Sequence, residues 1–313
     1  MNQKSGSAAI EIVEVGPRDG LQNEPLTIAT ADKIALIERA IAFGARRIEV
    51  ASFVHPGKVP QMADAEAVVA GLPRRGDVTY IGLALNVRGA ERALAAGVDE
   101  IGAVCVSTDS FATRNQGQSS AESIAIARDL VALANAAGRS ASITIGAAFG
   151  CPFEGDVPAA HIVDMALRAA DSGAREIVLA DTIGVGTPAQ VTQLVQLVAP
   201  AIAPTPLRVH FHNTRNTGIA NVWAAVSSGV TTVDASLGGL GGCPFAPGAS
   251  GNVPTEDVLY MLERSGIPTG LDLERAIAAS AWLSDIMGKA LPAALGRAGI
   301  FPKKASAAGV QAG

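Results

Sequence analysis

The sequence predicts an α/β protein with the fold of a (β/α)₈ TIM barrel and additional C-terminal helices. Eight short apolar segments alternate with helical segments along 313 residues, at a spacing of about 30 residues. Most of these segments are nearly continuous apolar runs, which suits parallel strands that are buried on both faces. A doubly wound open sheet, the main alternative, carries a G-x-G-x-x-G loop after its first strand, whereas this sequence reads GPRDGLQNEP there.

The predicted strands are residues 11–15, 46–52, 78–84, 100–107, 142–149, 176–182, 207–212 and 231–237. Helices are expected at residues 30–43, 119–137, 188–199, 217–228, 254–265 and about 273–290. Thr30 is the expected N-cap of the first helix. Ser119 and Glu122 have the spacing of a capping box, and Gly138 stands where the same helix would end.

We expect one catalytic domain over residues 1–313. The barrel would occupy about residues 10–270, a C-terminal helical extension about 271–300, and a disordered tail about 303–313. The apolar stretch at 276–287 would suit a homodimer interface.

The composition excludes several classes of protein. Hydrophobic residues make up 49%, charged residues 17%, and the mean hydropathy is +0.31, which is too apolar for a disordered chain. With 24 basic and 29 acidic residues the net charge is −5, and aromatic residues are only 4%, so a nucleic-acid partner is not expected. The sequence has no run of 18 apolar residues, and its start has no apolar region long enough for a signal peptide, so neither a membrane partner nor a signal peptide is expected. Three cysteines do not form a disulfide framework. We therefore expect a soluble, cytoplasmic protein.

Polar side chains gather where five predicted strands end. The catalytic residues of such barrels lie at the C-terminal ends of the strands. The residues in question are Arg18 and Asp19 after the first strand, Glu49, Ser52 and His55 in and after the second, Asp181 and Thr182 in the sixth, His210, His212 and Asn213 in and after the seventh, and Cys243 and Asn252 after the eighth.

His210 and His212 are the sharpest feature. Alternation along a strand turns residues i and i+2 to the same face, so both imidazoles would point into the barrel mouth and could bind one divalent ion. The alternative is a pair of structural histidines. We favour the ligand pair, because two of only four histidines lie at one predicted strand end.

Asp19 would add a carboxylate oxygen to this site, and Asn252 could add a carbonyl oxygen. A mixed nitrogen and oxygen set suits Mg²⁺, Mn²⁺ or Co²⁺, and Zn²⁺ is not excluded. Asn252 has an alternative role, since asparagine before Val253 and Pro254 is also a good helix N-cap.

Arg18 lies beside Asp19, between the turn glycines Gly16 and Gly20. This position favours a guanidinium that faces substrate and stabilises a developing enolate or thioester oxygen, although a structural ion pair is the alternative. Glu49 in the second strand needs a partner if it is buried. Arg18 is the expected partner, either oriented by Glu49 for function or held in a plain buried ion pair.

Cys243 follows four glycines at positions 238, 239, 241 and 242. Such a loop could be a mobile lid that carries an acid/base thiol over the substrate. The alternative is an ordinary loop thiol. Cys105 and Cys151 are expected to pack in the interior.

These segments together resemble the hydroxymethylglutaryl-CoA lyase family, a group of metal-dependent TIM-barrel lyases with an Asp-Arg-Glu signature. The matching segments are VEVGPRDGLQNEP at 13–25, IEVASFVHPGKVPQMAD at 48–64, ADTIGVGTP at 180–188 and GGLGGCPFAPGASGNVPTEDVLYML at 238–262. The resemblance extends over about residues 10–300, and the glycine-rich segment with its cysteine is the most specific part.

The resemblance implies a role for each matching residue. The metal ligands would be Asp19, His210, His212 and Asn252. Arg18 would stabilise the enolate of the acyl-CoA and contact the substrate, and Glu49 would hold Arg18. Asp181 would lie by the metal and the substrate hydroxyl. Cys243 would protonate the departing enolate, and Gln22 would contact the substrate.

One segment departs from the family pattern. The family usually reads H-x-H-D-T followed by Tyr-Gly, whereas this chain has Asn213 after the second histidine and Arg215 further on. Both changes make the loop less negative. Arg215 could therefore pair with a carboxylate of the substrate, and the acyl group accepted could differ.

The resemblance implies a retro-Claisen cleavage of 3-hydroxy-3-methylglutaryl-CoA to acetyl-CoA and acetoacetate, with Mg²⁺ or Mn²⁺, as in leucine degradation. Asp181 is the favoured base over a strand-seven histidine, because a metal-bound imidazole is a poor base. One alternative is a lyase for a related branched 3-hydroxyacyl-CoA. A Claisen-type synthase is less favoured because such enzymes carry longer C-terminal regions. A non-catalytic barrel is disfavoured by the retention of Arg18, Asp19, both histidines and Cys243.

Overall fold

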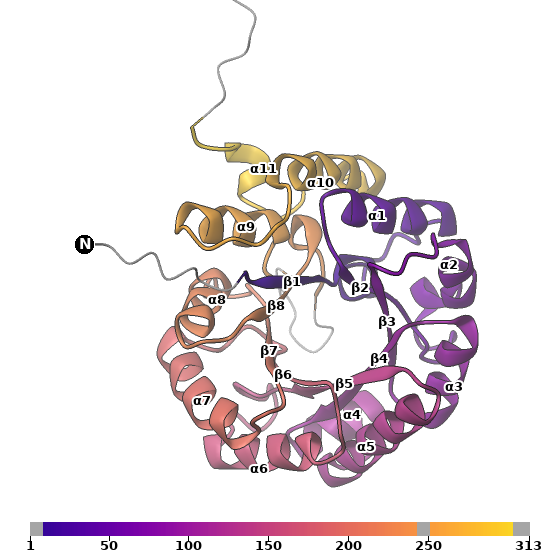
Figure 1. Cartoon of the computed structure of the whole chain (residues 1–313), viewed down its shortest axis with the longest axis vertical. Helices are drawn as coiled ribbons and strands as arrows, with labels where there is room; N and C mark the ends of the chain where they lie inside the picture. The colour runs from indigo at the N-terminus through magenta and orange to yellow at the C-terminus, as the bar shows by residue number, and fades with distance from the viewer. Residues whose placement is uncertain (1–8, 243–250, 303–313) are drawn as a thin grey trace, which may run out of the picture.

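Eight parallel strands close into a barrel in sequence order, and β8 pairs with β1 (Figure 1). The computed structural model describes residues 9–242 and 251–302. The strands are β1 (Glu11–Glu14), β2 (Arg47–Ser52), β3 (Thr79–Ala84), β4 (Glu100–Val106), β5 (Ser140–Gly146), β6 (Glu176–Asp181), β7 (Leu207–Phe211) and β8 (Thr232–Ala235). The predicted (β/α)₈ barrel is therefore confirmed.

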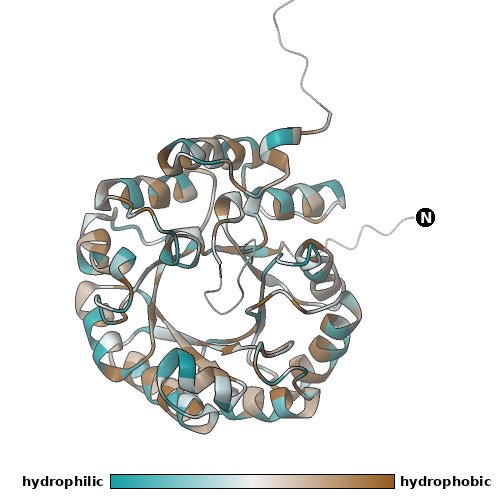
Figure 2. Cartoon of the chain, turned by 180° about the vertical axis from the view of Figure 1, so that it is seen from behind, coloured by the Kyte–Doolittle hydropathy of each residue, from teal (hydrophilic) through white to brown (hydrophobic). Residues whose placement is uncertain are grey.

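Helices form a ring outside the strands (Figure 1). They are α1 (Thr30–Ala42), α2 (Ala65–Gly71), α3 (Val87–Ala96), α4 (Asp109–Gln116), α5 (Ser120–Ala136), α6 (Ala159–Ala170), α7 (Pro188–Ala201), α8 (Gly218–Ser227), α9 (Thr255–Arg264), α10 (Leu273–Met287) and α11 (Leu295–Ala298). Three shorter turns are η1 (Gly16–Gly20), η2 (Pro60–Met62) and η3 (Leu237–Gly239). Hydrophilic and hydrophobic residues alternate along the ring helices (Figure 2), and their buried residues, such as Leu130 and Val131 of α5, join the core between helices and strands.

The helix ends follow their local chemistry, with one correction. Ser119 and Glu122 form the predicted capping box of α5. Thr30 was expected to be the N-cap of α1, but the N-cap is Ala29. The Thr30 hydroxyl instead donates to Asp64 over 2.7 Å, and Asp64 also pairs with Lys33.

Strand β5 is displaced from its predicted span of 142–149, since it covers Ser140–Gly146. The chain turns at Ala147, whose φ is 55°, and the Ala147 carbonyl accepts a hydrogen bond from Ser107. An apolar run therefore continues for three residues beyond the strand.

The C-terminal helices lie beside α1 and α9 (Figure 1). Helix α10 ends at Met287, earlier than the predicted 290, because Gly288 adopts a left-handed φ of 62°. The Asp257 carboxylate of α9 accepts the N–H groups of Ala294 and Leu295 at 2.9 and 2.8 Å, which ties the last segment to the barrel. The expected disordered tail lies outside the described residues. No helix within the described ranges is long and apolar enough to cross a membrane.

The interior of the barrel is charged near the N-terminal ends of the strands, which we call the lower end. Arg47 of β2 lies 3.0 Å from both Glu100 of β4 and Glu176 of β6, and all three side chains are at most 4% exposed. Arg208 of β7 lies 3.3 Å from Glu176 and 3.4 Å from Asp234 of β8. Buried carboxylates of three strands are thus compensated by two guanidinium groups.

Replacing Arg47 by methionine should destabilise the fold by about 3–5 kcal/mol, because Glu100 and Glu176 would stay buried without their shared cation. Equilibrium urea unfolding at neutral pH measures this loss. As a matched control, Arg139→Met breaks the exposed pair with Asp99 and should change the stability by less than about 1 kcal/mol. Equal losses in the two variants would contradict this account of the buried network.

Candidate metal centre and active site

The turn η1 brings Arg18 and Asp19 to the mouth of the barrel. Pro17 has no N–H and a fixed φ, which favours a tight turn directly after β1. The N–H groups of Arg18, Asp19 and Gly20 all bond to the carbonyl of Val15, at 2.8–3.2 Å. This tight turn places both charged side chains at the C-terminal end of β1.

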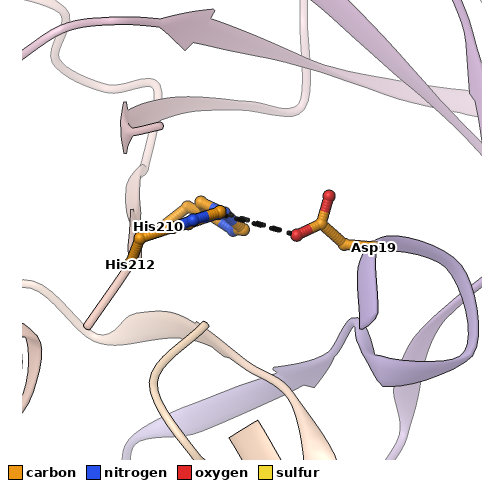
Figure 3. Close-up of side chains that lie close together, drawn as sticks. All are labelled: Asp19, His210 and His212. Atoms are coloured by element: carbon orange, nitrogen blue, oxygen red, sulfur yellow. Dashed lines mark ion pairs between the residues drawn. The ribbon is translucent and has the colours of Figure 1, made fainter. Parts of the chain in front are cut away.

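Asp19, His210 and His212 meet at this end (Figure 3). The Asp19 Oδ2 atom lies 3.8 Å from Nε2 of His210 and 3.8 Å from Nε2 of His212. One potential ligand atom from each residue lies within 4.8 Å of the others. Both imidazoles therefore face one carboxylate, as the alternation along the strand predicts.

Asn252 joins the same cluster. Its Nδ2 donates to Asp19 Oδ2 over 2.7 Å and to the Leu240 carbonyl over 3.0 Å, while its Oδ1 is buried without a partner. The N-cap of α9 is Pro254, so the helix-capping alternative for Asn252 is wrong. A buried amide oxygen without a partner, beside two imidazoles and a carboxylate, is a donor set that fits a divalent cation.

Arg18 lies between two carboxylates. Its guanidinium is 2.5 Å from Asp19 and 2.6 Å from Glu49, and its Nε donates to Glu49 over 2.7 Å. The pairing in β2 to β3 shifts register between Glu49 and Ala51, and such irregularities re-aim side chains beside active sites. Burial alone would raise the pKa of Asp19, but Arg18 and the two imidazoles hold that pKa well below its usual value. Asp19 is thus ready to act as an anionic ligand.

Asp234 is a functional residue that the sequence analysis missed. Its Oδ2 lies 3.1 Å from Nδ1 of His210 and favours the tautomer that carries its proton on Nδ1. The Nε2 atom, which faces Asp19, then keeps its lone pair for a metal. Its other oxygen lies 3.4 Å from Nε of Arg208. An acid in the middle of the apolar segment 231–237 needs a buried partner, and this was the signal that could have identified it.

Asp181 and Arg215 shape the turn after β6. The two Asp181 oxygens accept the N–H groups of Val185 and Gly186, each at 2.9 Å, and the residue is 1% exposed. The exposed Arg215 donates from Nη1 to the carbonyls of Ile183 and Gly184, at 2.9 and 3.1 Å. Among the described residues, neither of these side chains lines the cavity. Asp181 nevertheless lies close enough to His210 and His212 to interact electrostatically with both.

A cavity of about 320 Å³ opens beside the ligand cluster. Gln22 lines it, and the Oε1 atom of Gln22 is buried without a partner. The polar wall of the cavity includes Arg18, Asp19, Gln22, Glu49, His210 and His212, and its apolar wall includes Val54, Val59, Leu83, Leu85, Val106 and Phe111. One side of the cavity can therefore hold charged groups, and the other can hold a hydrocarbon group.

Cys243, the expected lid thiol, lies outside the described residues. Cys105 and Cys151 are buried, as expected, and burial raises the pKa of Cys105 to about 12. Neither of these two thiols lines the cavity.

Comparison with known proteins identifies the family. The model of the HMGL-like family matches residues 9–283. The chain belongs to the HMGL-like family. It is 42% identical over 311 residues to the (R)-citramalyl-CoA lyase of Chloroflexus aurantiacus, which covers 96% of this chain and 98% of that protein. It is 41% identical over 283 residues to the hydroxymethylglutaryl-CoA lyase YngG of Bacillus subtilis, which covers 90% of this chain and 95% of that protein.

A solved structure supports the same family. The structure of an HMG-CoA lyase from Acinetobacter baumannii in complex with coenzyme A and 3-methylmalate superposes with a TM-score of 0.91 and 40% identity, covering 95% of this chain and 97% of that one. The expected hydroxymethylglutaryl-CoA lyase family is thereby confirmed, and the chain is a carbon–carbon lyase.

Asp234→Asn should weaken Mn²⁺ binding by about 10-fold or more, because the carboxylate that orients His210 loses its charge. Calorimetric titration of the metal-free protein with Mn²⁺ measures this. Glu176→Gln is the control, since it changes a carboxylate of the same buried network that makes no contact with either histidine. Wild-type affinity in Asp234→Asn would show that His210 needs no such support.

Proposed function

We propose that this lyase cleaves 3-hydroxy-3-methylglutaryl-CoA to acetyl-CoA and acetoacetate. The observation that carries the proposal is the meeting of Asp19, His210, His212 and Asn252 at one cavity, beside the Arg18–Glu49 pair. A retro-Claisen cleavage needs a polarised hydroxyl and a stabilised enolate, and these two clusters supply the groups for each.

The four clustered residues would hold a divalent metal, and Mg²⁺ or Mn²⁺ is the proposed ion. When bound, such a metal lowers the pKa of a coordinated hydroxyl and polarises a neighbouring oxygen. Asp19 contributes the negative charge of the set, and both imidazoles contribute nitrogen.

In the reaction, the bond between the carbinol carbon and the α-carbon of the thioester breaks. The hydroxyl proton leaves to Asp181, the proposed base, whose carboxyl interacts electrostatically with His210 and His212. The carbinol becomes the ketone of acetoacetate, and the electron pair of the broken bond forms the thioester enolate. The guanidinium of Arg18 lines the cavity and stabilises the enolate oxygen. Glu49 fixes that guanidinium, and Gln22 offers its unpaired oxygen to the substrate.

Asp181 has a structural role besides that of the proposed base. Its two oxygens accept backbone N–H groups, so it also shapes the turn after β6. Ala180 and Thr182, on either side of it, do line the cavity. Arg215 supports the same turn by donating hydrogen bonds to the carbonyls of Ile183 and Gly184.

Cys243 is the proposed donor of the proton that converts the enolate into acetyl-CoA. Cys243→Ala should keep wild-type Mn²⁺ affinity but lose at least about 100-fold in kcat, the usual scale of a general acid. His212→Ala should lose metal and activity together. Full turnover by Cys243→Ala would remove the thiol from the mechanism.

A second candidate substrate is citramalyl-CoA, which the same cleavage would convert to acetyl-CoA and pyruvate. The observation in its favour is that the similarity to the (R)-citramalyl-CoA lyase covers 96% of this chain, against 90% for the Bacillus subtilis enzyme. The two substrates share the hydroxyl, the methyl group and a free carboxylate, and differ by one methylene.

The deciding experiment compares acyl-CoA substrates under reducing conditions, with Mg²⁺ or Mn²⁺ and with or without a chelator. The panel holds 3-hydroxy-3-methylglutaryl-CoA, both enantiomers of citramalyl-CoA, and a glutaryl analogue with a longer branched group in place of the methyl. We expect the highest kcat/KM, abolished by chelator, for the first compound. A higher value for citramalyl-CoA would establish the second candidate, and turnover that resists chelation would overturn the metal-dependent mechanism.

A further inference from the structure

Glu14 is a buried carboxyl group behind the metal centre that the mechanism does not use. It is the last residue of β1 and is 1% exposed. Its neighbours Val13 and Val15 line the cavity, so Glu14 is turned to the other face of the strand. It therefore contacts the loops that surround the site, and not the substrate.

Three separate segments bond to this one carboxyl group. Oε1 accepts the N–H of Gly16 over 2.8 Å and the N–H of Leu237 over 2.9 Å, and Oε2 accepts the hydroxyl of Thr255 over 2.6 Å. Leu237 and Thr255 lie 223 and 241 positions away in the sequence. Local chain geometry therefore cannot hold these segments together. Glu14 bonds to all three, in addition to the backbone bonds of Ser236 with Val253 and Thr255.

Each of these segments leads to the metal cluster. Gly16 opens the turn that carries Asp19, three residues later. Thr255 follows Asn252 by three residues, and Asn252 donates to Asp19 over 2.7 Å. Leu237 begins η3, which leads to Gly241, where an added Cβ would lie 2.4 Å from the Asn252 amide. Glu14 thus sets the spacing of two ligand-bearing loops and of the glycine-rich loop that packs on them.

The residues around Glu14 are tightly packed. A Cβ at Gly16 would lie 2.6 Å from Glu14 Oε1, so the chain can approach the carboxyl only where glycine stands. Glu256 of α9 faces the same region and accepts the N–H of Gly238 over 3.0 Å. The loops are therefore fixed to buried acceptors on two sides.

We propose that Glu14 is a positioning residue of the metal centre, which holds Asp19 and Asn252 at the separation that metal binding needs. The inference rests on the proposed metal centre, but not on the identity of the acyl-CoA.

The structure provides a matched pair of substitutions. In Glu14→Gln the amide oxygen can accept both N–H groups, and the NH₂ group can donate to the Thr255 hydroxyl. Burial raises the pKa of Glu14 to about 7, so a neutral group of this shape suits the site. In Glu14→Met the volume stays similar, but the N–H groups of Gly16 and Leu237 lose their acceptor.

The test is the dissociation constant of Mn²⁺ alone, by calorimetric titration of the metal-free protein, with circular dichroism to establish that each variant is folded. We expect about 10- to 100-fold weaker binding in Glu14→Met and rescue by Glu14→Gln to within about 3-fold of wild type. Thr255→Val removes one of the three bonds with little change of volume. Its Mn²⁺ dissociation constant should lie between those of Glu14→Gln and Glu14→Met. Thr255→Val therefore still tests the proposal if Glu14→Met does not fold.

Asp257 supplies a chemically matched control, because its carboxylate also accepts two backbone N–H groups but serves the C-terminal segment. Asp257→Leu should lower the melting temperature and leave Mn²⁺ affinity unchanged. Weaker Mn²⁺ binding in Asp257→Leu equal to that in the Glu14 variants would reduce Glu14 to a general stabiliser. Wild-type affinity in folded Glu14→Met and Thr255→Val would overturn the proposal.

These outcomes separate the inference from the proposed function. A wild-type protein that binds Mn²⁺ but cleaves no acyl-CoA would contradict the proposed function, and the Glu14 comparison would still decide this proposal. A wild-type protein that binds no Mn²⁺ would overturn the metal centre and the role of Glu14 together.

Discussion

Charge compensation inside the barrel is the constraint on which the site depends. A parallel barrel buries the inward side chains of its strands, and a buried charge without a partner is costly. Here the interior holds two levels of paired charge. Arg47 and Arg208 compensate the carboxylates below, and Arg18 lies between Asp19 and Glu49 at the mouth. At the mouth two carboxylates share one guanidinium, and this excess of one negative charge favours a bound cation.

The two levels are connected through one histidine. Asp234 contacts Arg208 below and His210 above, at 3.4 and 3.1 Å. The imidazole is therefore oriented by the same network that pairs the buried charges of the barrel interior, and its Nε2 faces Asp19. From the other side, Glu14 fixes the loops that carry Asp19 and Asn252. The metal cluster is thus held from within the barrel and from behind it.

The sequence was sufficient to predict the barrel and the meeting of Asp19 with His210 and His212. Strand alternation and the common end of parallel strands determine that arrangement without any knowledge of packing. Glu49 was recognised as a buried acid in need of a partner, and Arg18 is that partner. The same reasoning applies to Asp234, but its partners lie on a neighbouring strand, and register cannot be read from one sequence. Glu14 was beyond prediction, because two of its three partners come from positions more than 220 residues away.

The departures from the family pattern after β7 act on the scaffold. Asn213 accepts the N–H of Gly218 over 2.9 Å at the start of α8, and Arg215 bonds to carbonyls of the turn after β6. Neither residue lines the cavity. Among the described residues, Arg215 reaches the cavity only through the turn that Asp181 also holds, whose Ala180 and Thr182 line the wall. A route from Arg215 to the substrate therefore passes through the shape of this wall.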